Sequence, residues 1–506
     1  MILGRLIKGL DIPEMHGDPG VEIGGLAYDS RKVRPGDLFV ALKGRRVDGH
    51  EFIEEAVKRG SAAVVCEGFR DLSPGKAAVI RVGDAHEALS RLAVNFYDYP
   101  FRKMRLIGIT GTNGKTTTSY LLEAVLAASG AKPGVIGTVN YRIPGQVWSA
   151  PVTTPESLDL MRTLRLMADE EVSHVIMEVS SHAIEQGRTR GCPFRVAVFT
   201  NFSRDHLDYH GSLDAYFQAK ARLFRSREVD GRIVPGHAVI NGDDARAPDL
   251  LSVTDSPVMT YGVLSPGNLK AERLRVEKNG LSATIRSPAG DMEIESSLVG
   301  EFNVYNILAA AGAALCMGVS PEHVRQGIKS LKGIPGRLER VENGRSLTIL
   351  VDYAHTPDAL SKVLGALRPV TEGRIITVFG CGGDRDKGER GEMGRVAGEA
   401  GDLVIITSDN PRTEDPADIA GPIERGVRET GLEFFEPDKA RKGRLRGYSV
   451  ELDRRRAIEL AVGVAEPRDV VLIAGKGHED YQIVGTAKRP FDDRKVASEA
   501  ISAGAE

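Results

Sequence analysis

Apolar segments of strand length alternate with longer amphipathic segments along most of the chain. In the middle of the sequence, apolar runs at 174–179 and 196–201 follow a stretch, 157–170, that has the spacing of an amphipathic helix. Such alternation is typical of right-handed strand–helix–strand crossovers, so it predicts parallel sheets covered by helices. The predicted fold class is therefore α/β.

The same pattern divides the chain into three predicted domains, the number that about 500 residues suggests. Residues 1–98 are expected to form an N-terminal α/β domain. Residues 104–336 are expected to form a central domain with a parallel sheet and a phosphate loop (P-loop). Residues 337–506 are expected to form a C-terminal Rossmann-like domain.

Two further segments refine the picture of the later domains. Alternating polarity across 260–300 predicts an antiparallel insertion, and the alanine-rich stretch 306–317 predicts a buried helix. In the third domain, each apolar run ends in a polar or glycine-rich segment, which is where a doubly wound sheet binds its ligands. These runs are 347–351, 374–379, 403–407 and 470–474.

Composition narrows the function classes. Hydrophobic residues make up 41% of the chain and charged residues 27%, as in an ordinary globular protein. The formal charge of −3 argues against nucleic-acid binding through a global positive field. No apolar run approaches the length of about 20 residues needed to cross a membrane, so no membrane insertion is expected. Four scattered cysteines without CxxC spacing indicate reduced thiols and a cytoplasmic protein.

The segment from Gly108 to Thr117 carries the strongest chemical signal. It follows an apolar run and precedes a helical pattern, so its order is strand, glycine loop, helix. Gly111 and Gly114 let backbone N–H groups approach a polyphosphate, and Lys115 supplies a charge for the outer phosphates. The hydroxyl of Thr116 or Thr117 suits Mg²⁺. A chance glycine turn is the alternative, and Ile109 departs from the usual loop pattern.

Acidic and basic side chains follow the next strands. Glu178 ends an apolar run and can hold Mg²⁺ against the phosphates, although a solvated strand-end carboxylate is the alternative. His206 lies in the polar cluster 201–210 and is either a second metal ligand or a proton-transfer group. Lys220 lies on a predicted helix, 213–224, where a lone lysine is ordinarily exposed; if buried and neutral, its amine could form a carbamate with CO₂.

Several polar segments in the later part of the chain are candidate ligand contacts. Asn303 can meet a nucleotide base, whereas Asn306 has the alternative role of capping the helix. Arg337 ends a turn at the domain boundary, and Asp352 follows a strand. The polar loops 379–388, 409–412 and 474–480 each follow a predicted strand, and three such loops at one sheet edge favour a ligand pocket. In 409–412, Asp, Asn and Arg around a rigid proline suit recognition of the two ends of an amino acid. Each loop alone could be an ordinary polar turn.

In this order, the motifs resemble the Mur ligases, the ATP-dependent amide-forming enzymes of bacterial cell-wall synthesis. The resemblance covers the whole chain, and the Ile109 form of the loop is usual in that family. The segment from Asp409 to Arg412 looks like the family's signature for meso-diaminopimelate. Gly187 stands where relatives often have histidine.

The resemblance implies roles for individual residues. The catalytic residues would be Lys115, Glu178, His206 and Lys220, the last at the position where the family carries a carbamylated lysine. Magnesium would be held by Thr116, Glu178, His206 and Lys220. ATP would be bound by Gly111, Thr112, Asn113, Gly114, Lys115, Thr116, Thr117, Asn303, Arg337 and Asp352. The UDP-N-acetylmuramoyl dipeptide would be bound by Ser30, the segment 43–47, Thr153, Thr154, Ser180, Gln186 and Arg188. The incoming diamino acid would be bound by Arg385, Asp409, Asn410, Pro411, Arg412, Gly475 and Glu479.

The implied reaction joins meso-diaminopimelate to UDP-N-acetylmuramoyl-L-alanyl-D-glutamate by way of an acyl phosphate, with ATP and Mg²⁺, in a monomeric enzyme. His206 is one candidate for the proton acceptor. Three alternatives stay open at this point. They are a lysine-adding ligase of the same family, a folylpolyglutamate synthase, and a P-loop switch or transport ATPase.

Overall fold

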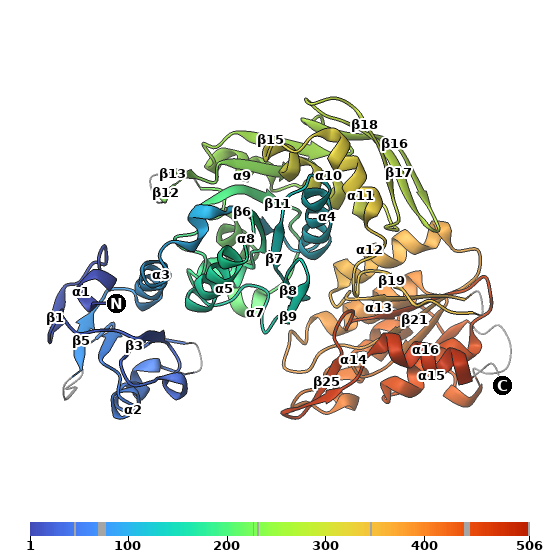
Figure 1. Ribbon diagram of the computed structural model, residues 1–506. Helices are drawn as coiled ribbons and strands as arrows, with labels where there is room; N and C mark the ends of the chain where they lie inside the picture. Colours follow the sequence, from blue (N-terminus) through green and yellow to red (C-terminus); the bar gives the residue numbers. More distant parts are fainter. Residues whose placement is uncertain are drawn as a thin grey trace.

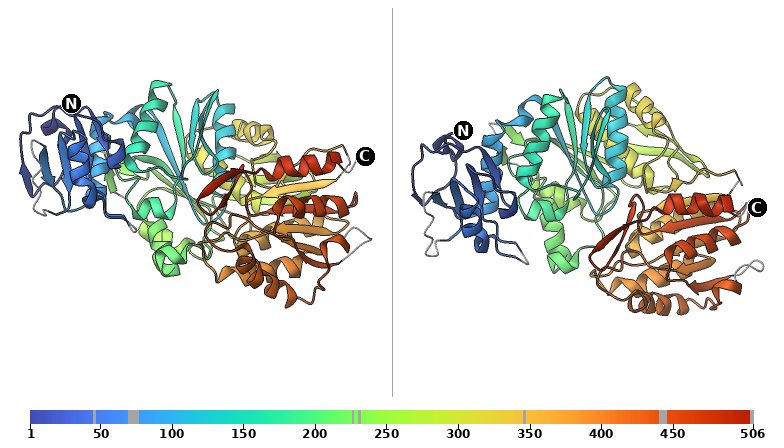
Figure 2. Two further views of the ribbon diagram at one scale, coloured as in Figure 1. Left: turned by 90° about the horizontal axis from the view of Figure 1, so that it is seen from below. Right: turned by 60° about the horizontal axis from the view of Figure 1, so that its bottom comes forward.

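Three sheets follow one another along the chain (Figure 1). The computed structural model describes residues 1–44, 47–68, 77–225, 227–229, 232–344, 347–439 and 446–503. The first sheet lies at one end of the molecule, the third at the other, and the largest sheet between them, as the turned views of Figure 2 also show. The predicted boundaries at 98, 104 and 336 stay a prediction.

The first sheet has five strands in the order β1-β5-β4-β3-β2, of which only β1 is antiparallel to its neighbour. Its strands are β1 (Glu14–His16), β2 (Gly25–Ala27), β3 (Asp37–Val40), β4 (Ala63–Cys66) and β5 (Ala78–Arg81). Its helices are α1 (Leu3–Leu6), α2 (Ile53–Lys58) and α3 (Ala85–Phe96). The fully buried strands β3 and β4 explain the near-continuous apolar runs of this region.

The central sheet has eleven strands in the order β18-β17-β16-β15-β14-β11-β6-β10-β7-β8-β9. Its parallel part comprises β6 (Arg105–Thr110), β7 (Pro133–Ile136), β10 (His174–Glu178), β11 (Phe194–Phe199), β14 (His237–Asn241) and β15 (Val258–Gly262). The remaining strands are β8 (Asn140–Ile143), β9 (Gln146–Ser149), β16 (Leu269–Glu277), β17 (Gly280–Arg286) and β18 (Met292–Ser296). Their pairings are antiparallel, except that β16 runs parallel to β15. The antiparallel pattern predicted across 260–300 is confirmed, but it extends the main sheet at one edge.

Helices cover the central sheet. They are α4 (Lys115–Ala128), α5 (Ser157–Asp169), α6 (Ser181–Glu185), α7 (Leu207–His210), α8 (Leu213–Ala221), α9 (Ala247–Val253), α10 (Phe302–Cys316) and α11 (Pro321–Ser330). A two-stranded hairpin, β12 (Arg227–Val229) with β13 (Arg232–Val234), precedes β14. Helix α10 begins before the predicted start at 306, because Glu301 and not Asn306 precedes its first turn. The alternative that Asn306 caps this helix is therefore wrong.

The third sheet has six strands in the order β19-β20-β24-β21-β22-β23, all parallel except β19. Its strands are β19 (Glu339–Arg340), β20 (Thr348–Asp352), β21 (Ile375–Phe379), β22 (Leu403–Ile406), β23 (Gly447–Val450) and β24 (Val470–Ala474). Its helices are α12 (Pro357–Leu367), α13 (Glu389–Ala400), α14 (Pro416–Arg428), α15 (Arg454–Val464) and α16 (Asp493–Ala503). A hairpin, β25 (Tyr481–Val484) with β26 (Ala487–Pro490), follows β24.

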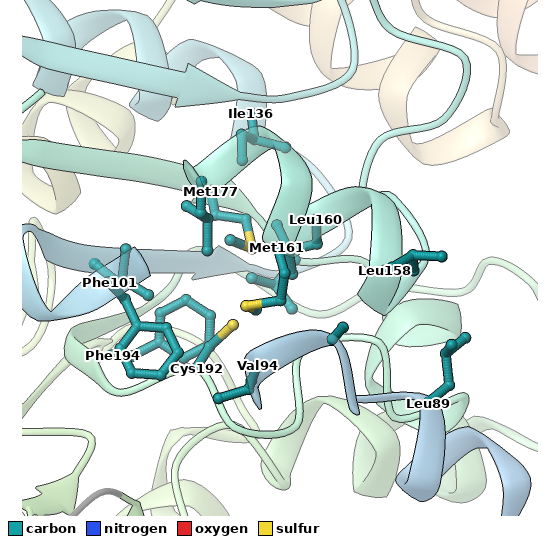
Figure 3. Close-up of a cluster of buried hydrophobic side chains, with 14 of the residues drawn as sticks. Leu89, Val94, Phe101, Ile136, Leu158, Leu160, Met161, Met177, Cys192 and Phe194 are labelled. Atoms are coloured by element: carbon teal, nitrogen blue, oxygen red, sulfur yellow. The ribbon is translucent and has the colours of Figure 1, made fainter. Parts of the chain in front are cut away.

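One hydrophobic cluster joins the first two sheets (Figure 3). Leu89 and Val94 on α3 pack in the same cluster as Leu158 and Met161 on α5. Both helices present an apolar stripe, and each stripe is buried against the other helix. The first sheet is therefore attached to the central sheet by a shared hydrophobic core as well as by the connecting chain.

Candidate active site

The phosphate loop connects β6 to α4, and two of its glycines are required by close contacts. Gly111 has φ +146°, and a Cβ there would lie 1.9 Å from the Thr200 hydroxyl oxygen. Gly114 has φ +85°, and a Cβ there would lie 2.3 Å from Asn306 Oδ1. Both positions demand glycine for conformation and for space. The loop is thus held against β11 and α10, with backbone N–H groups at the start of a helix, the arrangement that suits a phosphate.

Two lysines converge on one carbonyl of this loop. Lys115 Nζ donates to Gly111 O at 2.9 Å and to Thr112 O at 2.8 Å, and Lys220 Nζ donates to Gly111 O at 2.8 Å. Burial lowers the pKa of Lys115, and burial together with the Lys115 charge lowers the pKa of Lys220 well below its usual value. Two lysine amines beside one loop give it donors that a polyanion can use, and burial disfavours the charged form of Lys220 in its absence.

The ordinary expectation for Lys220, that a lone helical lysine is exposed, is wrong. The residue is 1% exposed, and its ammonium lies 4.4 Å from the centre of the Tyr216 ring. Helix α8 is apolar on the flank that bears Lys220, since Phe217 and Ala221 are also buried. Because that flank packs against the phosphate loop, the Lys220 side chain is buried with it.

Glu178, at the end of β10, meets the phosphate loop directly. Its Oε2 accepts hydrogen bonds from the hydroxyls of Thr116 (2.9 Å) and Thr138 (2.8 Å), and its Oε1 accepts from the Thr138 N–H at 3.1 Å. Arg337, from the segment leading to the third sheet, donates to the Thr116 hydroxyl at 3.2 Å. The sequence did not predict a role for Thr138, which follows the end of β7. The residue before it is Gly137, and its lack of a side chain makes room for the Glu178 carboxylate.

The oxygens around Thr116 suit magnesium chemically. A carboxylate and a hydroxyl are hard donors of the kind that Mg²⁺ binds together with phosphate oxygens and water. Glu178 and Thr116 already lie within hydrogen-bond distance of one another. Among the described residues, no three His, Cys, Asp or Glu side chains converge on one point to form a cage built from protein alone. The donor set therefore fits a Mg²⁺ ion whose remaining ligands are phosphate oxygens and water.

His206 lies at the start of α7 in a left-handed conformation, with φ +54°. Non-glycine residues adopt such angles at a cost, and they cluster at functional sites. Its ring lies 4.7 Å from the ring of His182, and its Nδ1 is 3.3 Å from Asp205. Burial, with Lys220 and Lys115 adding to it and Asp205 opposing it, lowers the pKa of His206 to about 4. The imidazole is consequently neutral at pH 7.

The five central positions expected to bind the dipeptide form one connected group. The Thr154 hydroxyl donates to Glu178 O at 2.8 Å and accepts from the Ser180 N–H at 3.1 Å. Arg188 donates to Thr154 O at 2.8 Å and to Gln186 Oε1 at 2.5 Å. The Thr153 hydroxyl lies 3.1 Å from that of Thr138, which in turn touches Glu178. The structure brings all of them to the end of β10.

The remaining dipeptide position lies on the first sheet. Ser30 begins a short helical turn, 30–32, and its hydroxyl donates to Glu55 Oε2 at 3.0 Å. Arg45 and Arg46, in the segment 43–47, lie outside the described residues. The Ser30 position is thus carried by a different sheet from the Thr154 group.

The expected nucleotide contacts lie between the central and third sheets. Asn303 and Arg337 both line a cavity of about 510 Å³. Asn303 is held by hydrogen bonds to Val299 O (2.8 Å) and from Asn306 Nδ2 (3.0 Å). Asp352 accepts from the N–H of Leu338 at 2.7 Å, and burial raises its pKa. The volume is in the range of small-molecule pockets.

Asp358 on α12 was missed in the sequence, and it bridges the third sheet to the phosphate loop. Its Oδ2 accepts from Asn113 Nδ2 at 2.9 Å, from the Ser203 hydroxyl at 2.9 Å and from Lys362 at 2.8 Å. The only sequence signal was its place in the first turn of a helix that follows β20. The contact brings the loops after β6, β11 and β20 together at one point.

The loops after β21, β22 and β24 meet at the carboxyl edge of the third sheet. Asn410 Nδ2 donates to Glu479 Oε2 at 2.9 Å, and a Cβ at Gly475 would lie 2.5 Å from Asp409 Oδ2. That Asp409 oxygen is buried and has no hydrogen-bond partner among the described residues, and burial raises the pKa of Asp409. A buried acceptor without a donor is the chemistry expected where a ligand ammonium binds.

The cationic side of this pocket is built around a turn. Pro411 is buried, and the next residue, Arg412, has φ +51° and donates to Gly383 O at 2.6 Å. A Cβ at Gly382 would lie 2.9 Å from the Arg412 guanidinium and 3.4 Å from Arg385 Cγ. The Arg412 guanidinium, which is able to bind a carboxylate, therefore borders this loop, and the stem of the Arg385 side chain lies close to the same glycine. Lys476, in the loop 474–480, is fully buried, and its Nζ lies 3.1 Å from Glu479 Oε2.

Three segments of the chain match domains of one family. Residues 22–97 match the Mur ligase family catalytic domain, 109–314 the Mur ligase middle domain, and 336–477 the Mur ligase glutamate ligase domain. The chain is also 48% identical over 503 residues to a protein of Geobacter metallireducens named UDP-N-acetylmuramoyl-L-alanyl-D-glutamate--2,6-diaminopimelate ligase, covering 99% of this chain and 98% of the relative. The chain belongs to the Mur ligase family. The resemblance predicted from the motifs is confirmed.

Solved structures agree with this Mur ligase assignment. A structure titled as UDP-N-acetylmuramoyl-L-alanyl-D-glutamate--2,6-diaminopimelate ligase matches with a TM-score of 0.69 and 33% identity, covering 100% of this chain and 99% of the other. A Mycobacterium tuberculosis folylpolyglutamate synthase complexed with ADP shares the fold, with a TM-score of 0.62, 21% identity, and coverage of 76% of this chain and 91% of the other. The three-domain α/β fold class is thereby confirmed.

No helix in the described part of this Mur ligase combines the length and the apolarity needed to cross a bilayer.

Proposed function

We propose that this Mur ligase joins meso-diaminopimelate to UDP-N-acetylmuramoyl-L-alanyl-D-glutamate at the expense of ATP. The names of the full-length relatives support this substrate pair. One observation from the chain carries it furthest: the unpartnered Asp409 oxygen and the Arg412 guanidinium lie in loops at the edge of the third sheet, with the Arg385 side chain beside the same loop. An amino acid whose side chain carries its own ammonium and carboxylate complements that pocket.

The proposed reaction has two balanced steps. The D-glutamyl carboxylate attacks the γ-phosphorus of ATP, and ADP leaves, so that an acyl phosphate forms. The neutral amine of diaminopimelate then attacks the acyl carbon; the tetrahedral adduct expels inorganic phosphate and leaves an amide. The amine gives up one proton in this second step, and that proton needs an acceptor near the acyl carbon.

The chain's residues divide this work. Lys115 and Arg337 lie where they can bind the outer phosphates and offset the charge that moves to the leaving oxygen. The loop's N–H groups at the start of α4 orient the phosphates. His206 is the candidate acceptor for the amine proton; it is neutral at pH 7, and its lowered pKa means that it would hold this proton only weakly. Thr154, Ser180 and Arg188 orient the dipeptide beside Glu178.

Magnesium fits the oxygens of Thr116 and Glu178, with His206 and Lys220 as further candidates. When bound, it would supply Lewis-acid polarisation of the phosphate oxygens. The lowered pKa of Lys220 favours the neutral amine, which is able to add CO₂, and the resulting carbamate would replace that amine by an oxygen donor.

The test is a panel of amino acids with the purified chain, ATP, Mg²⁺ and UDP-N-acetylmuramoyl-L-alanyl-D-glutamate. Phosphate release should require the UDP-linked dipeptide and meso-diaminopimelate together. Lysine in place of diaminopimelate as the preferred substrate would identify a lysine-adding ligase. Release driven by a folate with glutamate would identify a folylpolyglutamate synthase. Release without either acceptor or amine would point to an ATPase switch.

A further inference from the structure

A second cavity lies at the amino edge of the central sheet, away from the phosphate loop. It has a volume of about 650 Å³, and the starts of β6 and β11 and the carboxyl end of α10 line it. Strand β6 begins at this cavity and ends at the phosphate loop, so the two sites are separated by the length of the strand, roughly 20 Å. Nothing in the proposed reaction uses this cavity.

A β-bulge places an arginine in the cavity wall. Strand β11 pairs with β6 through Phe194 and Leu106 and then through Val196 and Ile107, so that Arg195 is an extra residue without a partner across the ladder. Bulges are rare in parallel pairs, and they redirect the side chain of the extra residue. A Cβ at Gly236 would lie 2.8 Å from Arg195 O and 3.1 Å from the Arg195 guanidinium, so glycine at this position leaves room for the bulged residue.

The positive charge of this wall is not neutralised within the described part of the chain. Arg195 has no ion pair or side-chain hydrogen bond there, and Arg105 donates only to Met317 O at 3.4 Å. No residue lining the cavity is acidic. The positive charge is also felt on neighbouring strands. Burial lowers the pKa of His174, and the Arg105 charge lowers it further; burial and the Arg195 charge lower the pKa of His237 in the same way. Arginines without carboxylates at a cavity are poised for an external anion.

The rest of the cavity wall is apolar. Met104 and Phe194 come from the starts of the two strands, and Cys316 and Met317 from the end of α10. Phe194 continues into the core beside Phe101 and Cys192 (Figure 3). The Cys316 thiol is protonated, because burial raises its pKa to about 11. An apolar wall with two guanidiniums beside it, in a volume typical of ligand pockets, suits a molecule with an apolar body and an anionic head.

We propose that this cavity binds a small organic acid. Its carboxylate or phosphate head pairs with Arg105 and Arg195, and its apolar part packs on Phe194 and the end of α10. The site is separate from the phosphate loop and from both proposed substrate pockets.

The experiment measures binding of 4-fluorobenzoate and of 4-fluorophenyl phosphate to the full chain by ¹⁹F NMR, with neutral 4-fluorobenzamide as the reference probe. At least one anion should bind, and the amide at least about tenfold more weakly. The two anionic arms show which head group the arginines prefer. The double variant Arg105→Gln/Arg195→Gln should lose binding about tenfold or more. Both side chains are exposed, so the variant is expected to fold.

Three variants locate the site. Lys115→Ala should keep binding, which separates the cavity from the phosphate loop. Arg273→Gln, at an exposed arginine on β16, is the matched charge control and should also keep it. Cys316→Phe, checked by its thermal unfolding midpoint, fills the apolar wall and should abolish binding. Absence of binding by both anions, equal binding of the amide, or full binding by the double arginine variant would overturn the proposal.

Discussion

A buried ion pair supports two of the loops that form the proposed amino-acid pocket. Arg454 and Asp493, the first residues of α15 and α16, are fully buried, with contacts of 2.8 Å from Nε to Oδ1 and 2.7 Å from Nη2 to Oδ2. Arg454 also donates to Ala474 O at 3.0 Å and to Ser408 O at 3.3 Å. Those carbonyls directly precede Gly475 and Asp409. The pair therefore fixes the ends of β24 and β22 at the pocket.

Asp493→Ala should destabilise the third domain strongly. Burial by itself would lower the pKa of Arg454, but Asp493 raises it above its usual value, so the guanidinium stays charged. Removing the carboxylate leaves a buried cation with only carbonyl partners, which costs about 3–5 kcal/mol. For a domain of this size the midpoint of thermal unfolding should fall by roughly 6–20 °C.

Calorimetry of the full chain measures that transition, and amide exchange in β24 localises it. Arg455→Ala is the matched control: this neighbouring arginine pairs with Glu499 at the surface, where the side chains are 46% and 60% exposed, and its loss should cost at most about 0.5 kcal/mol. The double variant Arg454→Met/Asp493→Leu should recover most of the stability. If Asp493→Ala stayed within about 1 kcal/mol of the parent, or Arg455→Ala were equally harmful, the buried-charge argument would fail.

The remaining predictions concern the site. Lys115→Ala should reduce phosphate release at least about 100-fold in a coupled assay, and near-normal release would contradict its role. Arg412→Ala should raise the apparent KM for meso-diaminopimelate with little change in kcat; an unchanged KM would remove it from the pocket. Asp358→Ala should weaken ADP binding about fivefold by calorimetry, through loss of the contact to the phosphate loop, and equal affinity would refute this. Burial, with the Asp205 charge adding to it, raises the pKa of Glu389 from 4.5 to about 7. Between these pH values the unfolded chain loses this proton while the folded chain keeps it, so the free energy of unfolding should fall as pH rises from 4.5 towards 7. Glu389→Gln should flatten that fall, as measured by thermal unfolding. An identical pH profile in the variant would disprove it.

Motifs that act through local conformation could be predicted from the sequence. The phosphate loop is one: Gly111 and Gly114 are needed for their own φ angles, and the strand before them and the helix after them follow from the apolar pattern. The parallel sheets are another, because buried parallel strands are continuous apolar runs. Strand ends carrying Glu178 and Asp409 could then be placed at the ligand-binding edge, as the structure has them.

Other features depend on what packs against a residue from elsewhere in the chain. Lys220 reads as an exposed helical lysine until α8 lies on the phosphate loop. Thr138 and Asp358 have no motif of their own, and they matter only because β7 neighbours β10 and because α12 reaches Asn113. A residue's own sequence sets its conformation and polarity. Its burial and its partners are set by long-range packing, which is why the tertiary structure alone decided these positions.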